Sequence, residues 1–314
     1  MSEIMIRVST VFAMIMIGYA ACKGKLIRGE AQVHLAALLL NINIPCMLLV
    51  SITGNELNAA LLRSTVQMLA LSGAYFAAAA LMIRGLLRVF RIRSIDPYRR
   101  GVYQAVFIST NAGFFGFPVT QMIFGDEALY YMVLLNIVMN LYLYSICPLQ
   151  LGGMRLREGI SRKNLSKLLN PCILSAVISI LLLFAHVHLP DYLVSVLKPI
   201  GDATIPLAMI LIGIQLAGQR VCSYLQDRQL LLVCLIRMIF WPGLVFLCLR
   251  WTPLPAFVRV VLVLGAALPP ASTISVLALG AGGDDELAAG GIVITTLLTC
   301  FSIPLCTVLM GMGG

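Results

Sequence analysis

The sequence predicts an all-α polytopic membrane protein in which ten transmembrane helices form two inverted repeats of five helices. Three observations support this prediction: the composition, the number of apolar segments and the position of the most basic loop. Of the 314 residues, 60% are hydrophobic and only 11% are charged, and the mean hydropathy is +0.98. Charged side chains are too few to cover a soluble globule, so the composition indicates a chain embedded in lipid.

Ten apolar segments are each long enough to cross a bilayer, which takes about 20 helical residues. They comprise residues 4–22, 34–53, 64–83, 101–124, 128–151, 171–189, 193–217, 229–250, 257–281 and 285–311. The first segment lacks a small-residue cleavage site, so it is expected to stay as a span rather than to act as a signal peptide. The whole chain, residues 1–314, is expected to form one membrane domain.

The distribution of Lys and Arg predicts the orientation in the membrane. With ten spans, sixteen of the 22 basic residues fall in the odd-numbered loops and five fall on the opposite side. By the positive-inside rule, the loops rich in Lys and Arg face the cytosol and both termini lie outside. The net charge of +9 is thereby explained by topology. Nucleic-acid binding is not expected, because the sequence offers no basic face with aromatic residues.

The most basic loop, at about residues 152–170, divides the chain near its middle. It separates repeat one, at about 1–151, from repeat two, at about 171–314, and each half holds five spans. An odd number of spans per half means that two homologous halves insert with opposite orientations, as in many secondary transporters. Prolines recur in the second and fourth spans of both halves, at Asn43-Ile44-Pro45, Thr204-Ile205-Pro206, Gly113–Pro118 and Leu268-Pro269-Pro270.

The fourth and ninth spans contain residues that interrupt a helix. Gly113 and Gly116 weaken helical propensity, and Pro118, like Pro269 and Pro270, lacks a backbone donor. In lipid, an irregular backbone is tolerated only where protein or a water-filled cavity surrounds it, so the breaks indicate a ligand path. Because proline favours the first position of a helix, Pro118 and Pro270 are each expected to start a second half-helix whose N-terminus attracts carboxylates.

Polar side chains next to the breaks are the first candidates for substrate contacts. Asn111 can offer an amide donor, and Ser272, Thr273 and Ser275 can offer hydroxyl groups. Each also has a purely structural interpretation. The amide could satisfy backbone groups that the break frees, and hydroxyl groups in membrane helices often bond to their own backbone.

A second set of candidates lies in the second and fifth spans. Asn136, Asn140 and Tyr144 are spaced four residues apart and share one helical face. This face could line a polar path or make ordinary interhelical hydrogen bonds. Asn43 and Ser51 are further candidates in the second span.

Charged residues inside the spans are rare, and this restricts the function. Arg237 is the one charge well inside a span, where it could act on a substrate or hold the carbonyl groups of a broken helix. Asp202 is expected to cap a helix N-terminus. Since the other carboxylates fall in loops or termini, a sodium/proton antiporter is rejected. Coupling through a protonated substrate, a Na⁺ site of carbonyl and hydroxyl oxygens, and uniport all stay open.

Enzymatic, metal-binding and cofactor-binding signatures are not found in the sequence. The nine cysteines are scattered singly without a Cys-x-x-Cys pair, so neither a disulfide framework nor a metal site is expected. The His-Glu-x-x-His motif and the short serine and aspartyl intramembrane protease motifs are absent. A channel and a non-transporting receptor are the alternatives to a carrier, and they differ from it in ion conductance and in binding without flux.

Several of these motifs together resemble the auxin efflux carrier family, and the resemblance extends over essentially the whole chain. The segments that carry it are Asn111 to Pro118, Gly201-Asp202-Ala203 before Ile205-Pro206-Leu207, Arg237 with Pro242, and Ala267-Leu268-Pro269-Pro270. The family includes plant auxin carriers and bacterial permeases for malate, malonate and related organic acids. The chain lacks the long cytosolic loop of many plant members, so the bacterial permeases are the closer comparison.

The resemblance implies a fold similar to sodium/proton antiporters and bile-acid symporters, in which broken helices 4 and 9 cross near the midplane. Spans 1, 2, 6 and 7 would form a scaffold and the other spans an elevator-type transport domain. The implied function is transport of a small organic anion across a bacterial inner (plasma) membrane, and H⁺ and Na⁺ are the candidate coupling ions. Dicarboxylates are the leading substrates, auxin-like or other monocarboxylates are the alternative, and a homodimer formed through the scaffold is implied as well. Gly113, Pro118 and Arg237 join the polar candidates at the substrate site.

Overall fold

The computed structural model describes residues 2–90, 96–152, 170–219 and 224–310, and every regular element within these ranges is helical. Most of the predicted basic linker, residues 153–169, lies outside the described residues, as do residues 91–95 and 220–223 of two other predicted basic loops. The prediction of an all-α chain is therefore confirmed for the described part.

The first half of the chain runs from α1 to α8. Two of its elements, η1 and η3, are π-helical turns, and each continues into the next helix without a gap. Residues 31–53 and residues 112–124 therefore each form one continuous helix. The elements are α1 (Ser2–Lys23), α2 (Ala31–Leu38), η1 (Leu39–Asn43), α3 (Ile44–Thr53), α4 (Ala59–Val89), α5 (Pro97–Ile108), η3 (Ala112–Gly116), α6 (Phe117–Phe124), α7 (Asp126–Ser145) and α8 (Cys147–Gly152).

The second half contains the remaining described helices, from α11 to α19. They are α11 (Pro171–Phe184), α12 (Asp191–Asp202), α13 (Thr204–Ala217), α15 (Arg228–Leu235), η5 (Ile236–Phe240), α16 (Trp241–Leu249), α17 (Ala256–Ala267), α18 (Thr273–Gly280) and α19 (Asp285–Leu309). The acidic residues 284–286 begin α19, as its N-cap and its first turn.

Seven helical stretches in the described residues are long and apolar enough to cross a membrane. They correspond to the predicted spans 1, 2, 3, 5, 7, 8 and 10. The predicted spans 4, 6 and 9 consist of shorter helices: span 4 and span 9 are interrupted, and span 6 is the 14-residue helix α11. The predicted end of span 6 at residue 189 is wrong, because α11 ends at Phe184 and an irregular segment follows.

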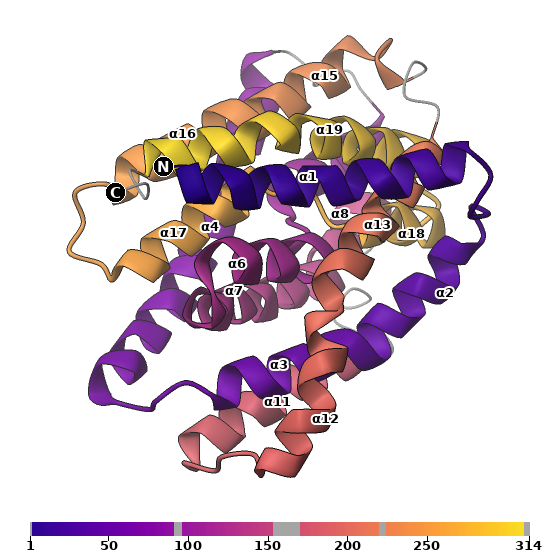
Figure 1. Ribbon diagram of the computed structural model, residues 1–314. Coiled ribbons are helices and arrows are strands. Elements are labelled where there is room, and N and C mark those ends of the chain that lie inside the picture. Colours follow the sequence, from indigo (N-terminus) through magenta and orange to yellow (C-terminus); the bar gives the residue numbers. More distant parts are fainter. Residues whose placement is uncertain (1, 91–95, 153–169, 220–223, 311–314) are drawn as a thin grey trace.

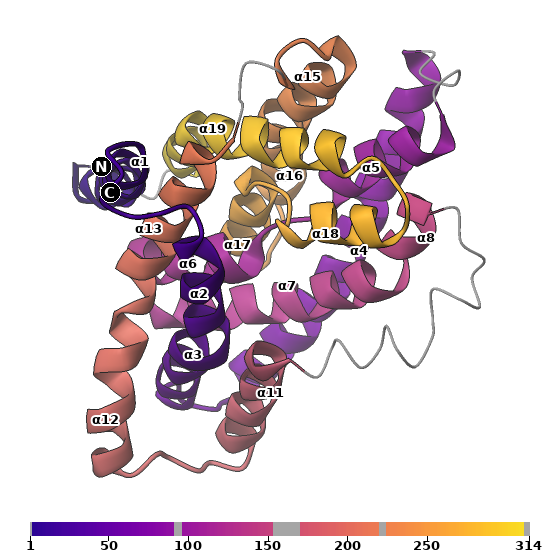
Figure 2. The same ribbon diagram turned by 90° about the vertical axis from the view of Figure 1, so that its right-hand side faces the viewer.

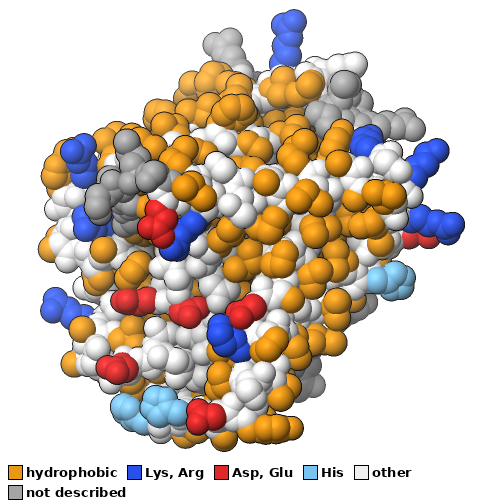
Figure 3. Space-filling view, in the orientation of Figure 1, with side chains coloured by type: hydrophobic (Ala, Val, Ile, Leu, Met, Phe, Trp, Pro, Cys, Tyr) orange, Lys and Arg blue, Asp and Glu red, His pale blue; other side chains and the backbone are white. Residues whose placement is uncertain are grey.

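The surface agrees with a lipid environment. Large hydrophobic side chains such as Ile6, Ile17 and Phe301 are more than half exposed. In Figure 3, hydrophobic side chains cover much of the face, whereas charged side chains are scattered at its edges and across its lower half. An exposed apolar area of this extent marks contact with a membrane or a partner. The chain is an integral multi-pass membrane protein.

Three prolines inside spans share one local structure. The π-helical turns η1, η3 and η5 each end two residues before a proline, namely Pro45, Pro118 and Pro242. A proline in a regular helix clashes with the carbonyl group four residues earlier and leaves it without a donor. A π-helical turn inserts one extra residue at this point and re-spaces the carbonyl groups. The helix therefore continues through each proline.

Asparagine and aspartate side chains begin several helices. Asn58, Asn170, Asp227 and Asp284 each accept a hydrogen bond from a backbone N–H in the first turn of α4, α11, α15 and α19, respectively. The prediction that Asp202 caps a helix N-terminus is wrong. It is the last residue of α12 and pairs with Lys198 one turn earlier, at 3.2 Å, because the helix begins eleven residues before it.

The helices are arranged in two groups around a central crossing. In Figure 2, α1, α12 and α13 lie along one side, next to α2 and α3, whereas α5, α8 and the C-terminal part of α4 lie on the other side. Helix α1 packs against α13, and α3 packs against both α11 and α12. At one end of the second group, Arg99 of α5 pairs with the α15 cap Asp227 at 2.5 Å and with the α19 cap Asp284 at 3.5 Å.

Two glycines allow α1 and α13 to approach closely. A Cβ atom built on Gly18 would lie 2.3 Å from the carbonyl oxygen of Ile210, and one on Gly213 would lie 2.1 Å from that of Ile15. Small residues at such crossings let helix backbones touch, which is the main source of helix association in lipid. The α1–α13 pair therefore depends on both glycines.

Gly213→Ala is expected to destabilise the folded protein by about 1–3 kcal/mol, because the added methyl group meets backbone that cannot rotate away. Thermal unfolding of the purified protein in detergent would show a lower Tm. The matched control is Gly243→Ala in α16, since a Cβ atom at Gly243 meets no atom within 4 Å. Equal Tm values for the two variants would contradict the close approach.

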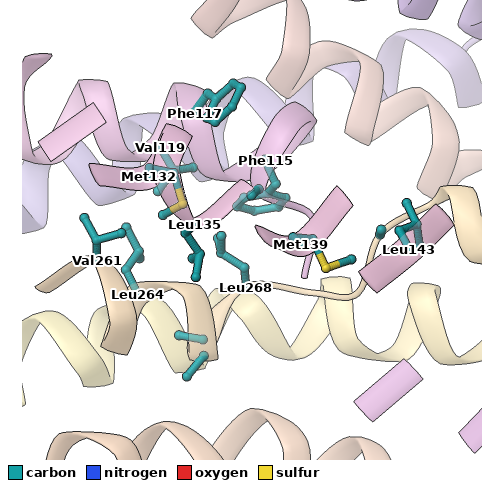
Figure 4. Close-up of a cluster of buried hydrophobic side chains, with 14 of the residues drawn as sticks. Phe115, Phe117, Val119, Met132, Leu135, Met139, Leu143, Val261, Leu264 and Leu268 are labelled. Atoms are coloured by element: carbon teal, nitrogen blue, oxygen red, sulfur yellow. The ribbon is translucent and has the colours of Figure 1, made fainter. Parts of the chain in front are cut away.

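The hydrophobic core surrounds the place where the two interrupted helices meet. In Figure 4, Met132, Leu135 and Met139 of α7 lie between side chains of η3 and α6 and side chains of α17, with Leu268 beside them. A Cβ atom on Gly116 would lie 2.9 Å from Leu268, so this glycine leaves room for that side chain. The core thus fixes the two interruptions against each other.

Candidate functional site

The interruptions at residues 109–111 and 268–272 lie in direct contact near the centre of the fold. The backbone N–H of Asn111 donates to the carbonyl oxygen of Pro269 at 2.7 Å. The hydroxyl group of Thr110 donates to the carbonyl oxygen of Gly265 at 2.9 Å. Each interruption therefore supplies partners for backbone groups that the other has freed.

At the C-terminal end of α17, the backbone carbonyl groups next to the interruption all have hydrogen-bond donors. Five consecutive carbonyl oxygens, those of residues 265–269, each accept a hydrogen bond from another segment. The donors, in that order, are Thr110, Arg237, Ser302, Arg237 again and the backbone of Asn111. A buried carbonyl group without a donor costs about 1–3 kcal/mol, so these contacts are needed to hold an unwound chain inside lipid.

Arg237 is the central donor of this arrangement. Its side chain is fully buried, with 0% exposed, and it projects from the π-helical turn η5. The guanidinium group donates to the carbonyl oxygens of Ala266 and Leu268 on one interruption and to that of Ser109 on the other, the last at 3.2 Å. Arg237 lines neither of the two cavities described below. It contacts the C-terminal ends of α5 and α17, the two helices that precede the interruptions.

The second half-helices begin differently from the prediction. The helix after the first break starts at Ala112, not at Pro118, and Asn111 caps it by accepting a hydrogen bond from the N–H of Phe114 at 3.2 Å. The helix after the second break starts at Thr273, not at Pro270. A side-chain cap starts the first of these helices, and the π-helical turn lets it pass through Pro118.

A cavity of about 460 Å³ lies between the two groups of helices. One wall comes from α2, η1 and α13, and the other comes from η3, α18 and α19. Its polar lining residues are Gln32, Asn111, Gln215, Gln219, Ser272, Thr273, Ser275 and Thr296. Its volume lies within the range typical of small-molecule sites.

A smaller cavity of about 190 Å³ adjoins the same centre. The predicted polar face of α7 lies here, together with both interruptions and the start of α11. Its polar lining residues are Asn41, Thr110, Asn111, Asn136, Asn140, Tyr144, Asn170 and Thr273. Asn111 and Thr273 are common to both cavities, so the two half-helix N-termini lie where the cavities meet.

The structure separates the predicted site residues into two sets. Those lining a cavity are Asn111, Gly113, Asn140, Ser272, Thr273 and Ser275. Those outside both cavities are Asn43, Ser51, Gly116, Pro118, Arg237, Pro269 and Pro270. The amide of Asn43 donates to the carbonyl oxygen of Ile200 at 2.8 Å, and the hydroxyl group of Ser51 accepts from Gln121 at 3.0 Å.

Several lining residues were missed by sequence reasoning. Gln32, Gln215 and Gln219 line the larger cavity from α2 and from the end of α13, and Asn41 lines the smaller one. Gln215 and Gln219 are four residues apart, which is the spacing that revealed the polar face of α7. That signal was present in the sequence and would have found them.

The described lining residues include polar side chains among apolar ones, and none of them is charged. Among the described residues that line the two cavities, none is Asp, Glu, His, Lys or Arg. In the described part of the chain, no group of three or more His, Cys, Asp or Glu side chains could hold a metal ion. Next to the cavities lie two helix N-termini, and a helix N-terminus is equivalent to about half a positive elementary charge.

The fold and the site together define the class of protein to which the chain belongs. A bundle of apolar helices encloses polar cavities at two interrupted helices, which is the arrangement of a multi-pass membrane protein with a small-molecule site among its spans. The chain belongs to the membrane transport protein family, which is the auxin efflux carrier family: its model matches residues 3–158 and 155–307. The resemblance to this family is confirmed, whereas the organic-acid permease type stays a prediction. No curated protein matches the chain significantly.

Proposed function

We propose that the protein is a secondary carrier of small organic anions, which bind where the two cavities meet, between Asn111 and Thr273. The observation that carries this proposal is the pairing of two half-helix N-termini at an uncharged polar cavity. Helix N-termini attract carboxylates through their unpaired N–H groups and their dipoles. The side chains of Ser272 and Ser275 add hydroxyl groups to the same cavity.

The charges at the crossing favour a substrate with one negative charge. The C-termini of α5 and α17 together carry about one negative elementary charge, and Arg237 neutralises it. The two N-termini then leave about one positive elementary charge facing the cavities. A dicarboxylate such as malate or malonate matches this charge in its singly protonated form. A monocarboxylate, the second candidate, matches it directly.

The proposal includes ten transmembrane spans in two inverted five-helix repeats. The contact between α1 and α13, predicted spans 1 and 7, has a counterpart in the contact between α11 and α3, predicted spans 6 and 2. The interruptions also fall in the fourth predicted span of each half. The family model matches the chain in two segments that meet at residues 155–158, close to the proposed boundary between the repeats.

We place the protein in a bacterial inner (plasma) membrane with both termini outside, in a state whose cavities open to the cytosol. Gln32, Gln219 and Asn170 line the cavities at the helix ends where the basic loops attach. At the opposite end, Arg7 of α1 donates to the carbonyl oxygens of Met122 and Ile123 at the end of α6, at 3.2 and 3.4 Å. An elevator movement that shifts α6 relative to α1 would break these contacts. Coupling to H⁺ or Na⁺ and a homodimeric assembly stay predictions.

The experiment that tests this proposal is counterflow of radiolabelled organic acids in proteoliposomes, with pH, Na⁺ and membrane potential varied separately. Flux of a dicarboxylate is expected to fall about tenfold per pH unit above its second pKa, because the singly protonated form becomes scarcer at that rate. Flux of a monocarboxylate is expected to stay constant over the same pH range.

Three results would contradict the proposal. Dicarboxylate flux that stays constant as pH rises would mean that the dianion is carried and that the charge balance at the crossing is incorrect. Movement of a cation or a neutral solute without any organic acid would remove the anion proposal altogether. Ion conductance without saturation would instead indicate a channel.

A further inference from the structure

A third cavity, of about 320 Å³, lies at the end of the bundle opposite the basic loops and shares no lining residue with the two cavities at the crossing. It lies between the ends of α16 and α19 and the start of α17. We call it the arginine groove. Its lining residues are Phe246, Leu249, Arg250, Ala256, Arg259, Val260, Val263, Leu309 and Met310.

The two arginines of the groove have no acidic partner among the residues that the structure describes. Neither Arg250 nor Arg259 forms an ion pair within 4.0 Å with any carboxylate in the described part of the chain. Arg259 donates to the carbonyl oxygen of Arg250 at 3.4 Å, and its Nε atom is buried without an acceptor. A buried donor without an acceptor is costly. The groove therefore offers two positive charges and an unused donor.

The start of α17 adds to this excess of positive charge. Pro255 occupies the N-cap position without a side-chain cap, and the first turn of the helix contains no acidic residue. A helix N-terminus favours an anion and disfavours a cation such as Arg259 near it. The unsatisfied N–H groups of the first turn and the two guanidinium groups thus all favour a negatively charged ligand at one place.

The remaining walls of the groove are apolar and face the membrane boundary. Phe246, Leu249 and Val263 line it beside the arginines. The guanidinium group of Arg250 lies over the rings of Phe246 and Trp251, at 5.9 and 5.6 Å, and Trp251 is 76% exposed. Exposed tryptophan and arginine residues at span ends are typical of the lipid headgroup region. A ligand with an anionic head and an apolar tail matches this combination.

We propose that the arginine groove binds an anionic phospholipid. Its phosphate lies between Arg250 and Arg259 at the N-terminus of α17, and part of an acyl chain lies along the apolar wall formed by α16 and α19. Guanidinium groups bind phosphate through paired, charge-assisted hydrogen bonds. Because α17 leads directly into the crossing at residues 265–269, a lipid here would stabilise the helix that carries the second interruption.

The test is a thermal-shift titration of the purified full-length protein in detergent, at constant ionic strength. The probes are dihexanoyl phosphatidylglycerol, dihexanoyl phosphatidylcholine and inorganic phosphate. We expect phosphatidylglycerol to raise the Tm at concentrations at which the other two have little effect. Arg250→Gln, an exposed position, is expected to weaken the apparent affinity about tenfold, and Arg250→Gln/Arg259→Gln further.

The matched control is Arg28→Gln/Arg63→Gln, which removes two exposed charges elsewhere and should keep the wild-type response. Three results would overturn the proposal. Inorganic phosphate with the same effect as phosphatidylglycerol would indicate a free-anion site. A wild-type response in Arg250→Gln would place the lipid elsewhere. A wild-type protein without any response would show that the groove binds no lipid, even if the double variant fails to fold.

Discussion

Arg237→Met is expected to destabilise the protein by several kcal/mol and to abolish flux. The substitution leaves the carbonyl oxygens of Ser109, Ala266 and Leu268 without their donor inside the membrane. Each buried carbonyl group without a partner costs about 1–3 kcal/mol. Thermal unfolding in detergent and counterflow in proteoliposomes would measure the two effects. The stability and the flux of Arg237→Lys should lie between those of the wild type and those of Arg237→Met. Lysine keeps the positive charge but lacks the planar guanidinium group with its several N–H donors.

The same experiment separates the two roles that the sequence left open for this arginine. If Arg237 holds the two interruptions together, stability and flux are lost in parallel. If it binds substrate, Arg237→Met stays as stable as the wild type and loses only substrate affinity. Arg63→Met is the control, because Arg63 is exposed at the start of α4 and should change neither quantity.

Asn111→Ala is expected to abolish flux while the protein stays folded and inserted in the membrane. Asn111 lines both cavities, and its amide is placed where a carboxylate would meet the first half-helix N-terminus. The substitution also removes a helix cap, which costs about 1 kcal/mol. The stability loss should therefore be small compared with that of Arg237→Met. Counterflow together with the Tm in detergent would measure both.

Asn111→Asp is the informative partner of this variant. Aspartate is as good a helix cap as asparagine, so the Tm should return to the wild-type value. The added carboxylate repels an anionic substrate and removes the amide donor, so flux should stay absent. Normal flux by either variant would show that Asn111 does not belong to the substrate site. If a variant is less stable but transports normally, the role of Asn111 is limited to capping the helix.

The sequence predicted the helical class well because lipid imposes a strong and local constraint. A span must satisfy its own backbone, so apolar runs of sufficient length reveal helices directly. It located the second interruption at Pro269 and Pro270, since proline acts on its own turn. The first break was expected at Gly113–Pro118, but the chain is helical there and the interruption lies just before, at residues 109–111. The sequence misplaced the starts of the second half-helices, because the cap at Asn111 and the π-helical turn before Pro118 depend on how the chain folds around them.

The candidate site was predicted only in part. Asn111, Thr273 and the polar face of α7 were found from spacing and from their position next to the breaks. Gln215 and Gln219 were missed, although their spacing carried the same signal. Asn43 and Ser51 were included, yet they bond to neighbouring segments outside both cavities. A polar residue in a span shows that a partner is needed, but it does not show which partner.

By itself, the sequence determined the membrane location, the helical class, the approximate positions of the two interruptions and the family, because composition and short motifs express these properties locally. Only the tertiary structure decided that the carbonyl oxygens of residues 265–269 find donors in Thr110, Arg237, Ser302 and Asn111. These donors are separated from their acceptors by up to about 160 residues, and no periodic pattern connects them. Long-range hydrogen bonds of this kind become visible only when the chain is packed, because buried backbone groups take whichever donors the fold brings to them.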